Sequence, residues 1–159
     1  MATTIPYENA TSGDKALAEL QRTLAKFNCQ SFGTMTDMEH GKTIVQFRWR
    51  NRTVSLEANW KGYAAAWLKA HPYNPRSRGS RADHEAKALK QAQVSVCSVL
   101  RDWVKGQVTA VECGIMSFEA AFFAHMLLPS GERVVDRVQS ENLLPAPADE
   151  KVVELKGPK

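Results

Sequence analysis

The feature that most constrains the fold is a stretch of alternating apolar and polar residues in the first half of the chain. Apolar residues occupy every second position over residues 45–49 and again over 54–58. A period of two residues is that of a β-strand with one buried face. Asn51 tolerates a positive φ and favours a tight turn between the two stretches. Together with a short segment over residues 32–36, the pattern predicts a three-stranded antiparallel meander with one apolar face.

Helical periodicity surrounds this meander. Apolar residues three or four positions apart predict a helix over residues 14–28, a short one over 60–70, a long one from Asp83 toward Val111, and another beginning near Ser117. Helices of this kind must bury their apolar stripes against the sheet. The predicted fold is therefore α+β, with a small antiparallel sheet covered on one face by helices and the order α-β-β-β-(α)-α-α.

The chain length of 159 residues suits one domain. We expect this domain over residues 14–138, after a flexible tail over 1–13 and before a disordered tail over 139–159 that is rich in Pro, Ala, Glu and Lys. Residues 71–82 contain two prolines, one glycine and no aliphatic side chain larger than alanine, which predicts a flexible basic loop within the domain.

Several classes of protein do not fit the sequence. The N-terminus has neither a basic region nor an apolar run, so no secretory signal is expected. No stretch reaches the roughly 18 apolar residues that span a bilayer, so no membrane association is expected. The three cysteines have no paired close spacing and predict reduced thiols in a cytoplasmic protein.

Positive charge is concentrated in one block. Residues 42–81 contain nine Lys or Arg and a single acidic residue, whereas the whole chain has a formal net charge of only +4. The same block holds three of the four tryptophans and two of the three tyrosines. Cations with interleaved aromatic residues are typical of proteins that hold a phosphate backbone and stack bases. The block therefore predicts a nucleic-acid-binding surface.

The candidate binding residues are the cations and aromatic residues of this block. They are Arg48, Arg50, Arg52, Lys61, Arg76, Arg78, Arg81, Trp60, Tyr63 and Tyr73. Strand alternation predicts that Arg48 and Arg50 share the open face of the sheet, with Arg52 beside them at the hairpin turn. We expect the basic loop over residues 71–82 to fold over this face and form one wall of a groove.

Single-stranded nucleic acid, bound without strong sequence preference, is favoured, because no predicted helix carries the basic stripe of a major-groove reader. The same composition allows two other readings. The cations can steer docking to an acidic protein partner, or they can keep the open sheet face from aggregating. Trp49 and Trp67 are expected in the core, since their periodicity points inward.

No arrangement of residues predicts catalysis. The four histidines are scattered without the spacing of metal ligands, and no phosphate-binding glycine loop or nucleophile with a base stands out. His125 and Glu119 lie on one predicted helix, but a structural role for His125 is favoured over acid–base chemistry. We therefore expect a binding protein without cofactor or metal, not an enzyme.

Residues 110–134 contain a distinctive series of short motifs. A glutamate and a glycine precede a Phe-Glu helix, which leads through Phe-x-Ala-His to Leu-Pro-x-Gly. The matching residues are Glu112, Gly114, Phe118, Glu119, Phe123, Ala124, His125, Leu128, Pro129 and Gly131. The series resembles a segment shared by small uncharacterised proteins of bacteriophages and prophages, and the similarity extends over most of residues 14–138.

This resemblance implies a phage-encoded protein that acts in the cytoplasm of a bacterial host. Such a protein either handles nucleic acid or inhibits a host enzyme or defence complex by contact through an acidic surface of that partner. The Phe-rich helix that begins near Ser117 either completes the core or forms the seam of a homodimer.

Overall fold

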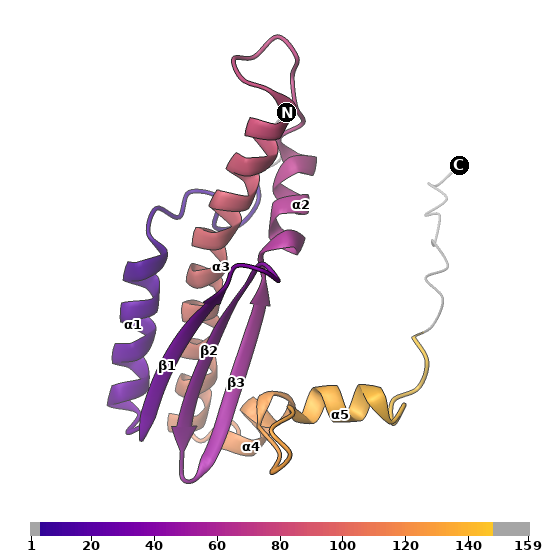
Figure 1. Cartoon of the computed structure of the whole chain (residues 1–159). Helices are drawn as coiled ribbons and strands as arrows, with labels where there is room; N and C mark the ends of the chain where they lie inside the picture. The colour runs from indigo at the N-terminus through magenta and orange to yellow at the C-terminus, as the bar shows by residue number, and fades with distance from the viewer. Residues whose placement is uncertain (1–3, 148–159) are drawn as a thin grey trace, which may run out of the picture.

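The predicted α+β architecture is confirmed in a computed structural model of the protein, which describes residues 4–147 (Figure 1). Three antiparallel strands form an open sheet in the order β1-β2-β3. Helices α1 and α3 cover one face of this sheet, and the other face is open (Figure 1). The elements are α1 (Gly13–Lys26), β1 (Ser31–Asp37), β2 (Lys42–Trp49), β3 (Arg52–Asn59), α2 (Trp60–Ala70), α3 (Arg81–Glu112), α4 (Phe118–Phe122), the short 3-10 helix η1 (Phe123–His125) and α5 (Val134–Ser140).

Strand register follows the alternation seen in the sequence. Phe47 in β2 lies opposite Phe32 in β1 and Val54 in β3, which places apolar residues of all three strands on the helix-covered face. The turn between β2 and β3 consists of Arg50 and Asn51, whose φ angles are 46° and 62°. Positive φ at both central residues is the requirement of the type I′ turn that joins twisted antiparallel strands.

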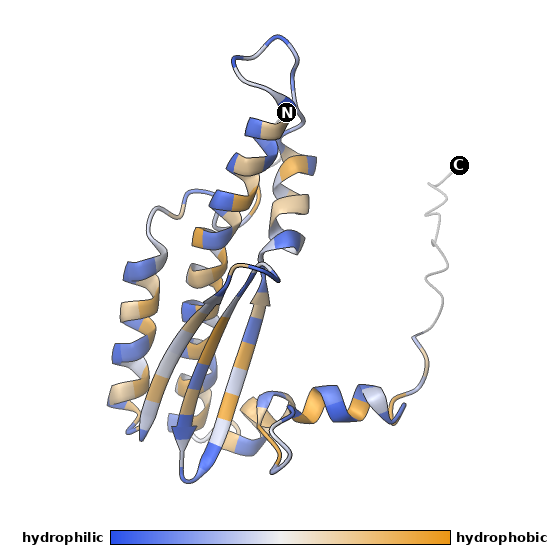
Figure 2. Cartoon of the chain, viewed as in Figure 1, coloured by the Kyte–Doolittle hydropathy of each residue, from blue (hydrophilic) through white to orange (hydrophobic). Residues whose placement is uncertain are grey.

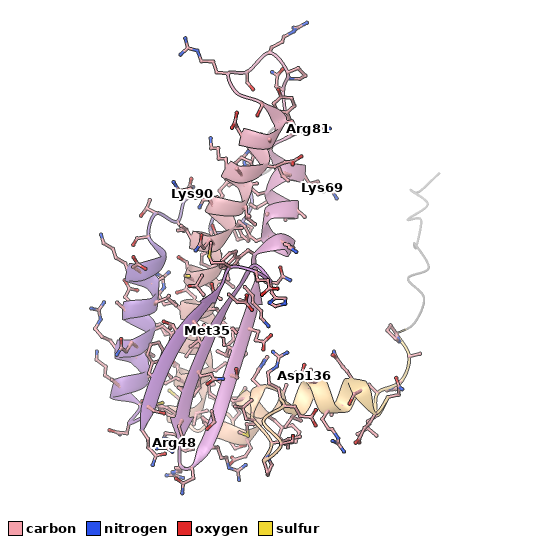
Figure 3. The ribbon with its side chains drawn as sticks, in the orientation of Figure 1. Met35, Arg48, Lys69, Arg81, Lys90 and Asp136 are labelled. Carbon is pink, nitrogen blue, oxygen red and sulfur yellow. The ribbon has the colours of Figure 1, made fainter. Side chains whose placement is uncertain are left out.

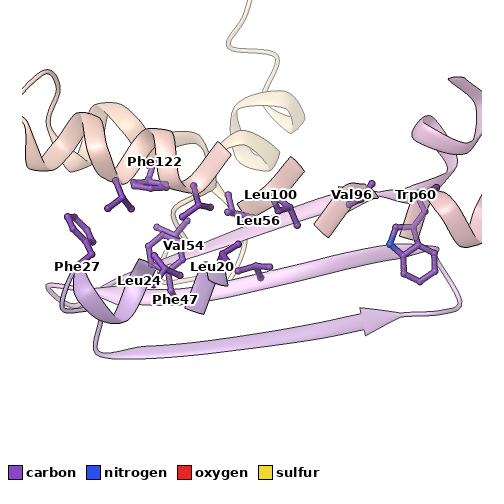
Figure 4. Close-up of a cluster of buried hydrophobic side chains, with 14 of the residues drawn as sticks. Leu20, Leu24, Phe27, Phe47, Val54, Leu56, Trp60, Val96, Leu100 and Phe122 are labelled. Carbon is purple, nitrogen blue, oxygen red and sulfur yellow. The ribbon is translucent and has the colours of Figure 1, made fainter. Parts of the chain in front are cut away.

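The core lies between the covered face of the sheet and the helices (Figure 4). Phe47 of β2 meets Phe122 of α4 edge to face, with ring centroids 5.3 Å apart. Leu20 and Leu24 of α1 and Val104 of α3 are fully buried around them. Hydrophobic residues gather where the helices face the sheet, whereas the connection between α2 and α3 is hydrophilic (Figure 2). Solvent therefore meets the open sheet face and the two ends of the molecule.

The N-terminal segment over residues 4–12 is held against α2 and α3. The Tyr63 hydroxyl donates a hydrogen bond to the Pro6 carbonyl oxygen at 2.5 Å, and the Ser95 hydroxyl donates to the Tyr7 carbonyl oxygen at 2.8 Å. Such bonds satisfy backbone groups that a free tail would leave to water. The backbone of this segment therefore has defined partners on α2 and α3, and the flexible N-terminal tail stays a prediction.

The C-terminal region leaves the body beside β3. The backbone N–H of Leu127 donates to the Thr53 carbonyl oxygen at 2.8 Å, so a short extended segment borders the sheet before α5 begins. α5 continues through Ser140, past the predicted domain end at residue 138. Residues 148–159, the last part of the predicted disordered tail, lie outside the described residues.

Among residues 4–147, no helix is both long enough and apolar enough to cross a bilayer.

Candidate nucleic-acid interface

β3 runs directly into α2, and α2 packs beside the first half of α3. The Asn59 side chain caps α2 by accepting a hydrogen bond from the Lys61 backbone N–H at 2.7 Å. At the same point the Trp60 backbone N–H donates to the Gly41 carbonyl oxygen at 2.9 Å, which ties the start of α2 to the β1–β2 connection. We call residues 60–92 the arm, because they project beyond the sheet (Figure 1), and residues 71–81 its tip.

An aromatic cluster holds the arm together below its tip. The Trp67 ring centroid lies 4.6 Å from that of His71 and 5.2 Å from that of His84. His84 Nε2 also donates a hydrogen bond to the His71 carbonyl oxygen at 2.7 Å, and the Tyr73 ring packs 5.8 Å from His84. These contacts join the end of α2 to the start of α3, so the arm is a packed hairpin of helices.

Local hydrogen bonds define the backbone of the tip. The Asn74 side chain accepts from the Arg76 N–H at 3.0 Å, which is an Asx turn. Ser80 caps α3 by accepting from the Asp83 N–H at 3.1 Å, and the Asp83 carboxylate accepts from the Ser80 N–H at 2.9 Å. This capping box lowers the pKa of Asp83 below its ordinary range, mainly through the backbone bond from Ser80. The segment predicted to be a flexible loop therefore has a bonded backbone of defined shape.

The arm carries an excess of positive charge. Residues 69–90 contain six Lys or Arg and two acidic residues, one of which is the capping residue Asp83. Lys69 and Lys90 lie on opposite flanks of the arm (Figure 3). The six cations are Lys69, Arg76, Arg78, Arg81, Lys87 and Lys90. Cations that surround a tip in this way can meet phosphates on more than one side.

Arg76 and Arg78 are two cations of the tip that solvent can reach. Both are exposed, and no acidic group among residues 4–147 lies within 4.0 Å of either guanidinium. Arg81 has a cation–π contact, since its guanidinium lies 6.0 Å from the centre of the Tyr73 ring. Arg76 and Arg78 thus offer the planar donor forks that phosphate oxygens accept.

The arm tip does not lie over the open sheet face. α2 continues in the direction of β3, so the tip is at the opposite end of the molecule from the β2–β3 turn (Figure 1). Arg81 and Arg48 mark these two ends in Figure 3. The predicted groove between the loop over residues 71–82 and the sheet arginines is therefore wrong. The physical reason is that the chain leaves β3 without a reversing turn.

The sheet arginines have three different surroundings. Arg48 is exposed near the end of β2, but Arg50 belongs to the turn and not to the strand. The Arg50 guanidinium lies 4.4 Å above the Trp49 ring, a cation–π contact. Arg52 forms an ion pair with Glu119 at 3.5 Å. The prediction that Arg50 shares the strand face with Arg48 is therefore wrong.

Burial decides which predicted aromatic residues can meet a base. Trp60 is only 3% exposed, and its indole N–H donates to the Thr43 hydroxyl at 2.9 Å. Tyr63 is half-buried against the core, with its hydroxyl bonded to Pro6. Tyr73 is half-buried at the tip, and its hydroxyl donates to the Gly79 carbonyl oxygen at 3.2 Å. The prediction that Trp60 stacks on bases is therefore wrong, and Tyr73 is the aromatic residue nearest to the free arginines in sequence.

Three cations of the arm were not among the predicted binding residues: Lys69, Lys87 and Lys90. Lys61, which was predicted, is exposed at the base of the arm. Lys87 and Lys90 lie beyond residue 81, where the basic block was taken to end, whereas Lys69 lies within the block but was not chosen as a binding residue. Had the predicted helices been paired as a hairpin, their outward-facing lysines would have joined the candidate residues.

His125 and Glu119, the two residues considered for acid–base chemistry, contact different parts of the structure. His125 packs edge to face against Trp103, with ring centroids 5.4 Å apart, whereas Glu119 is paired with Arg52. Burial lowers the pKa of His125 below its ordinary range, and the nearby Arg133 lowers it further. Within residues 4–147, no three His, Cys, Asp or Glu side chains are grouped to hold a metal ion.

Comparisons of the chain with protein-family models, with curated proteins and with solved structures found no match.

Proposed function

We propose that the protein binds nucleic acid through phosphate contacts made by the arm, with little readout of base identity. The observation that carries the proposal is the placement of Arg76 and Arg78 on a hydrogen-bonded tip, without an acidic partner among the described residues. Neutralising phosphates releases condensed counterions, and this is the dominant source of sequence-independent affinity. Because the backbone of the tip already has a defined shape, binding phosphates would cost less conformational entropy than ordering a flexible loop.

The strand form of the nucleic acid is part of the proposal to be tested. Single strands are favoured by the sequence because no predicted helix carries the basic stripe of a major-groove reader. Trp60 is buried, which removes one stacking residue, and α3 begins with basic residues at Arg81, Lys87 and Lys90. Phosphate contacts can form with single-stranded and with duplex nucleic acid, so the test includes DNA of both forms.

The cellular setting is also a proposal. It rests on the resemblance of residues 110–134 to small proteins of bacteriophages and prophages, which implies a protein that acts in the cytoplasm of a bacterial host. A protein made during infection meets both phage and host nucleic acid there. Sequence-tolerant binding through phosphates suits that setting, because affinity then depends little on whose sequence is bound.

The test is a double substitution of the two free arginines at the tip. Arg76→Gln/Arg78→Gln is expected to weaken binding to labelled single-stranded and duplex DNA in fluorescence anisotropy. The slope of log affinity against log salt should become shallower by about two units, roughly one for each lost phosphate contact. Thermal unfolding should be unchanged, since neither guanidinium has an ion-pair or cation–π partner among residues 4–147.

A matched control removes two exposed cations elsewhere. Lys15→Gln/Arg22→Gln takes the same charge from α1 and should leave the salt slope nearly unchanged. Equal losses in the two variants would mean that net charge, and not the arm, drives binding. If the wild-type protein shows no affinity at about 150 mM salt, the proposal fails, and an acidic protein partner of the host becomes the better explanation.

A further inference from the structure

Cations without an acidic partner occur at a second place in the molecule. We call residues 48–52, which close the β2–β3 hairpin, the turn end. Arg48 and Arg50 are exposed there, and no acidic group among the described residues lies within 4.0 Å of their guanidinium nitrogens. Arg50 also stacks on the Trp49 ring at 4.4 Å, a contact that leaves the edge of its guanidinium to donate to phosphate oxygens. The turn is held in place because the Asn51 N–H donates to the Gln30 side-chain oxygen at 3.2 Å, and the Gln30 N–H donates to the Arg48 carbonyl oxygen at 2.7 Å.

The turn end and the arm tip face in opposite directions along the molecule (Figure 3). Between them lie the eight residues of β3 and the eleven of α2, which follow one another in the same direction. At about 3.3 Å per strand residue and about 1.5 Å per helical residue, they separate the two ends by roughly 40 Å. α3 spans the same axis with 32 residues, a length of about 48 Å.

The middle of the molecule offers no continuous basic track between these ends. Lys42 is paired with Glu57 at 2.9 Å on the sheet. Arg101 on α3 is paired with Asp102 at 2.8 Å and with Glu19 at 3.4 Å. A phosphate backbone running along the body would have to displace these internal pairs. Exposed cations without an ion pair among the described residues do occur between the ends, at Lys15, Arg22, Lys26 and Lys105. Acidic residues of the same helices offset them, so the excess of positive charge is concentrated at the two ends.

We infer that the protein binds two separate nucleic-acid segments, one at the arm tip and one at the turn end, and so holds them together as a monomer. The inference rests on the proposed function, because it assumes that the arm tip binds phosphates. It adds a second phosphate-binding end that Arg48 and Arg50 form. The separation of the ends leaves each one able to approach a duplex without the other touching it.

The test counts the duplexes that one monomer binds. The probe is a GC-rich DNA duplex of about 8 base pairs, which at about 3.4 Å per pair is roughly 27 Å long. It is too short to reach from one end to the other, a separation of roughly 40 Å. Titration well above the dissociation constant, with light scattering to establish the mass of the complex, should give two duplexes per monomer. Beads carrying one such duplex should also capture a second, labelled duplex when the protein is added.

Two variants separate the ends. Arg76→Gln/Arg78→Gln removes the arm-tip group, and Arg48→Gln/Arg50→Asn removes the turn-end group. Asn is used at position 50 because it tolerates the positive φ of the turn. Each variant should bind one duplex per monomer in anisotropy, and neither should capture a second duplex on beads.

The outcomes distinguish the inference from the proposed function. One duplex per wild-type monomer would overturn the second end while leaving the arm as a binding site. Bead capture that survives in the turn-end variant would overturn it too, because a homodimer with one site on each arm would then explain bridging. Absence of any binding by the wild-type protein would overturn both.

Discussion

Trp60 and Arg76 come from the same basic, aromatic block of sequence, yet their surroundings give them different roles. The Trp60 ring is buried and its N–H is bonded to Thr43, so removing it would cost a buried hydrogen bond as well as packing. Arg76 is exposed, and within residues 4–147 its guanidinium has no hydrogen-bond or ion-pair partner. Residue type alone does not show whether an aromatic side chain packs in the core or stacks on bases, because tryptophan and tyrosine are favoured in both places.

His125 shows a second residue whose surroundings set its chemistry. Its Nδ1 atom is buried and has no hydrogen-bond partner among the described residues. Burial lowers its pKa below the ordinary 6.5, and the positive charge of Arg133 acts in the same direction, against a smaller opposing effect of Asp136. Between the lowered folded pKa and 6.5, the unfolded chain binds more protons than the folded protein, so stability falls as pH drops through that window.

Replacing His125 by Phe should therefore flatten part of the pH dependence of stability. Urea midpoints measured from about pH 8 to about pH 5 should fall less for His125→Phe than for the wild-type protein, because the variant has no imidazole to protonate. His40→Gln is the control, since the His40 ring is largely exposed in the β1–β2 connection. Identical pH profiles for the wild type and His125→Phe would show that the buried imidazole does not couple to folding.

At the scale of elements, α3 shows what a periodic pattern can and cannot predict. A long helix starting near Asp83 was expected, and α3 begins at Arg81 with Asp83 in its capping box. Leu89 in the first turns of α3 is exposed, whereas Ala88 and Ala92 are fully buried. Small side chains let α2 approach this part of α3 closely. Farther along, Val96, Leu100 and Val104 are buried as their hydrophobicity predicts. Hydrophobicity alone ranks leucine above alanine and therefore misplaces the buried face only near the start of the helix.

Ser80 caps α3 where the helix follows the tip, and loss of this cap should lower the stability of the protein. Ser80→Ala removes the oxygen that accepts from the Asp83 N–H and should lower the free energy of unfolding by about 1 kcal/mol. Urea denaturation measures the loss, and Ser80→Thr, which keeps a hydroxyl acceptor, should retain most of the stability. An alanine variant as stable as the wild type would mean that water satisfies the first turn of α3 equally well.

At the scale of the whole molecule, the arm makes the protein elongated. The length of α3 alone is about 48 Å, whereas a compact chain of 159 residues has a radius of gyration of about 15 Å. Small-angle scattering should therefore give a radius of gyration above about 15 Å and a maximum dimension above about 48 Å. A chain ending at residue 147 is the control that removes the contribution of the last residues. A compact profile would mean that the arm folds back on the sheet.

The sequence by itself determined the elements from α1 to the start of α4 and the layer that they form, whereas η1 and α5 were not among its predicted helices. Alternation over residues 45–58 specified strands with one apolar face, and stripes of period three or four specified the helices, because each period commits side chains to a face that must be buried. Those signals are local, so they also identified the turn at Asn51 and the cap region of α3. The concentration of cations in residues 42–81 was likewise visible without a structure.

Only the tertiary structure decided where these elements point and which side chains they cover. The direction of α2 depends on the Asn59 cap and on the bond from Trp60 to Gly41, and this direction moved the basic loop from the sheet face to the far end of the molecule. The burial of Trp60 against Thr43 depends on residues 17 positions apart. Periodicity assigns a residue to a face of its own element, but contacts between distant segments decide what that face meets.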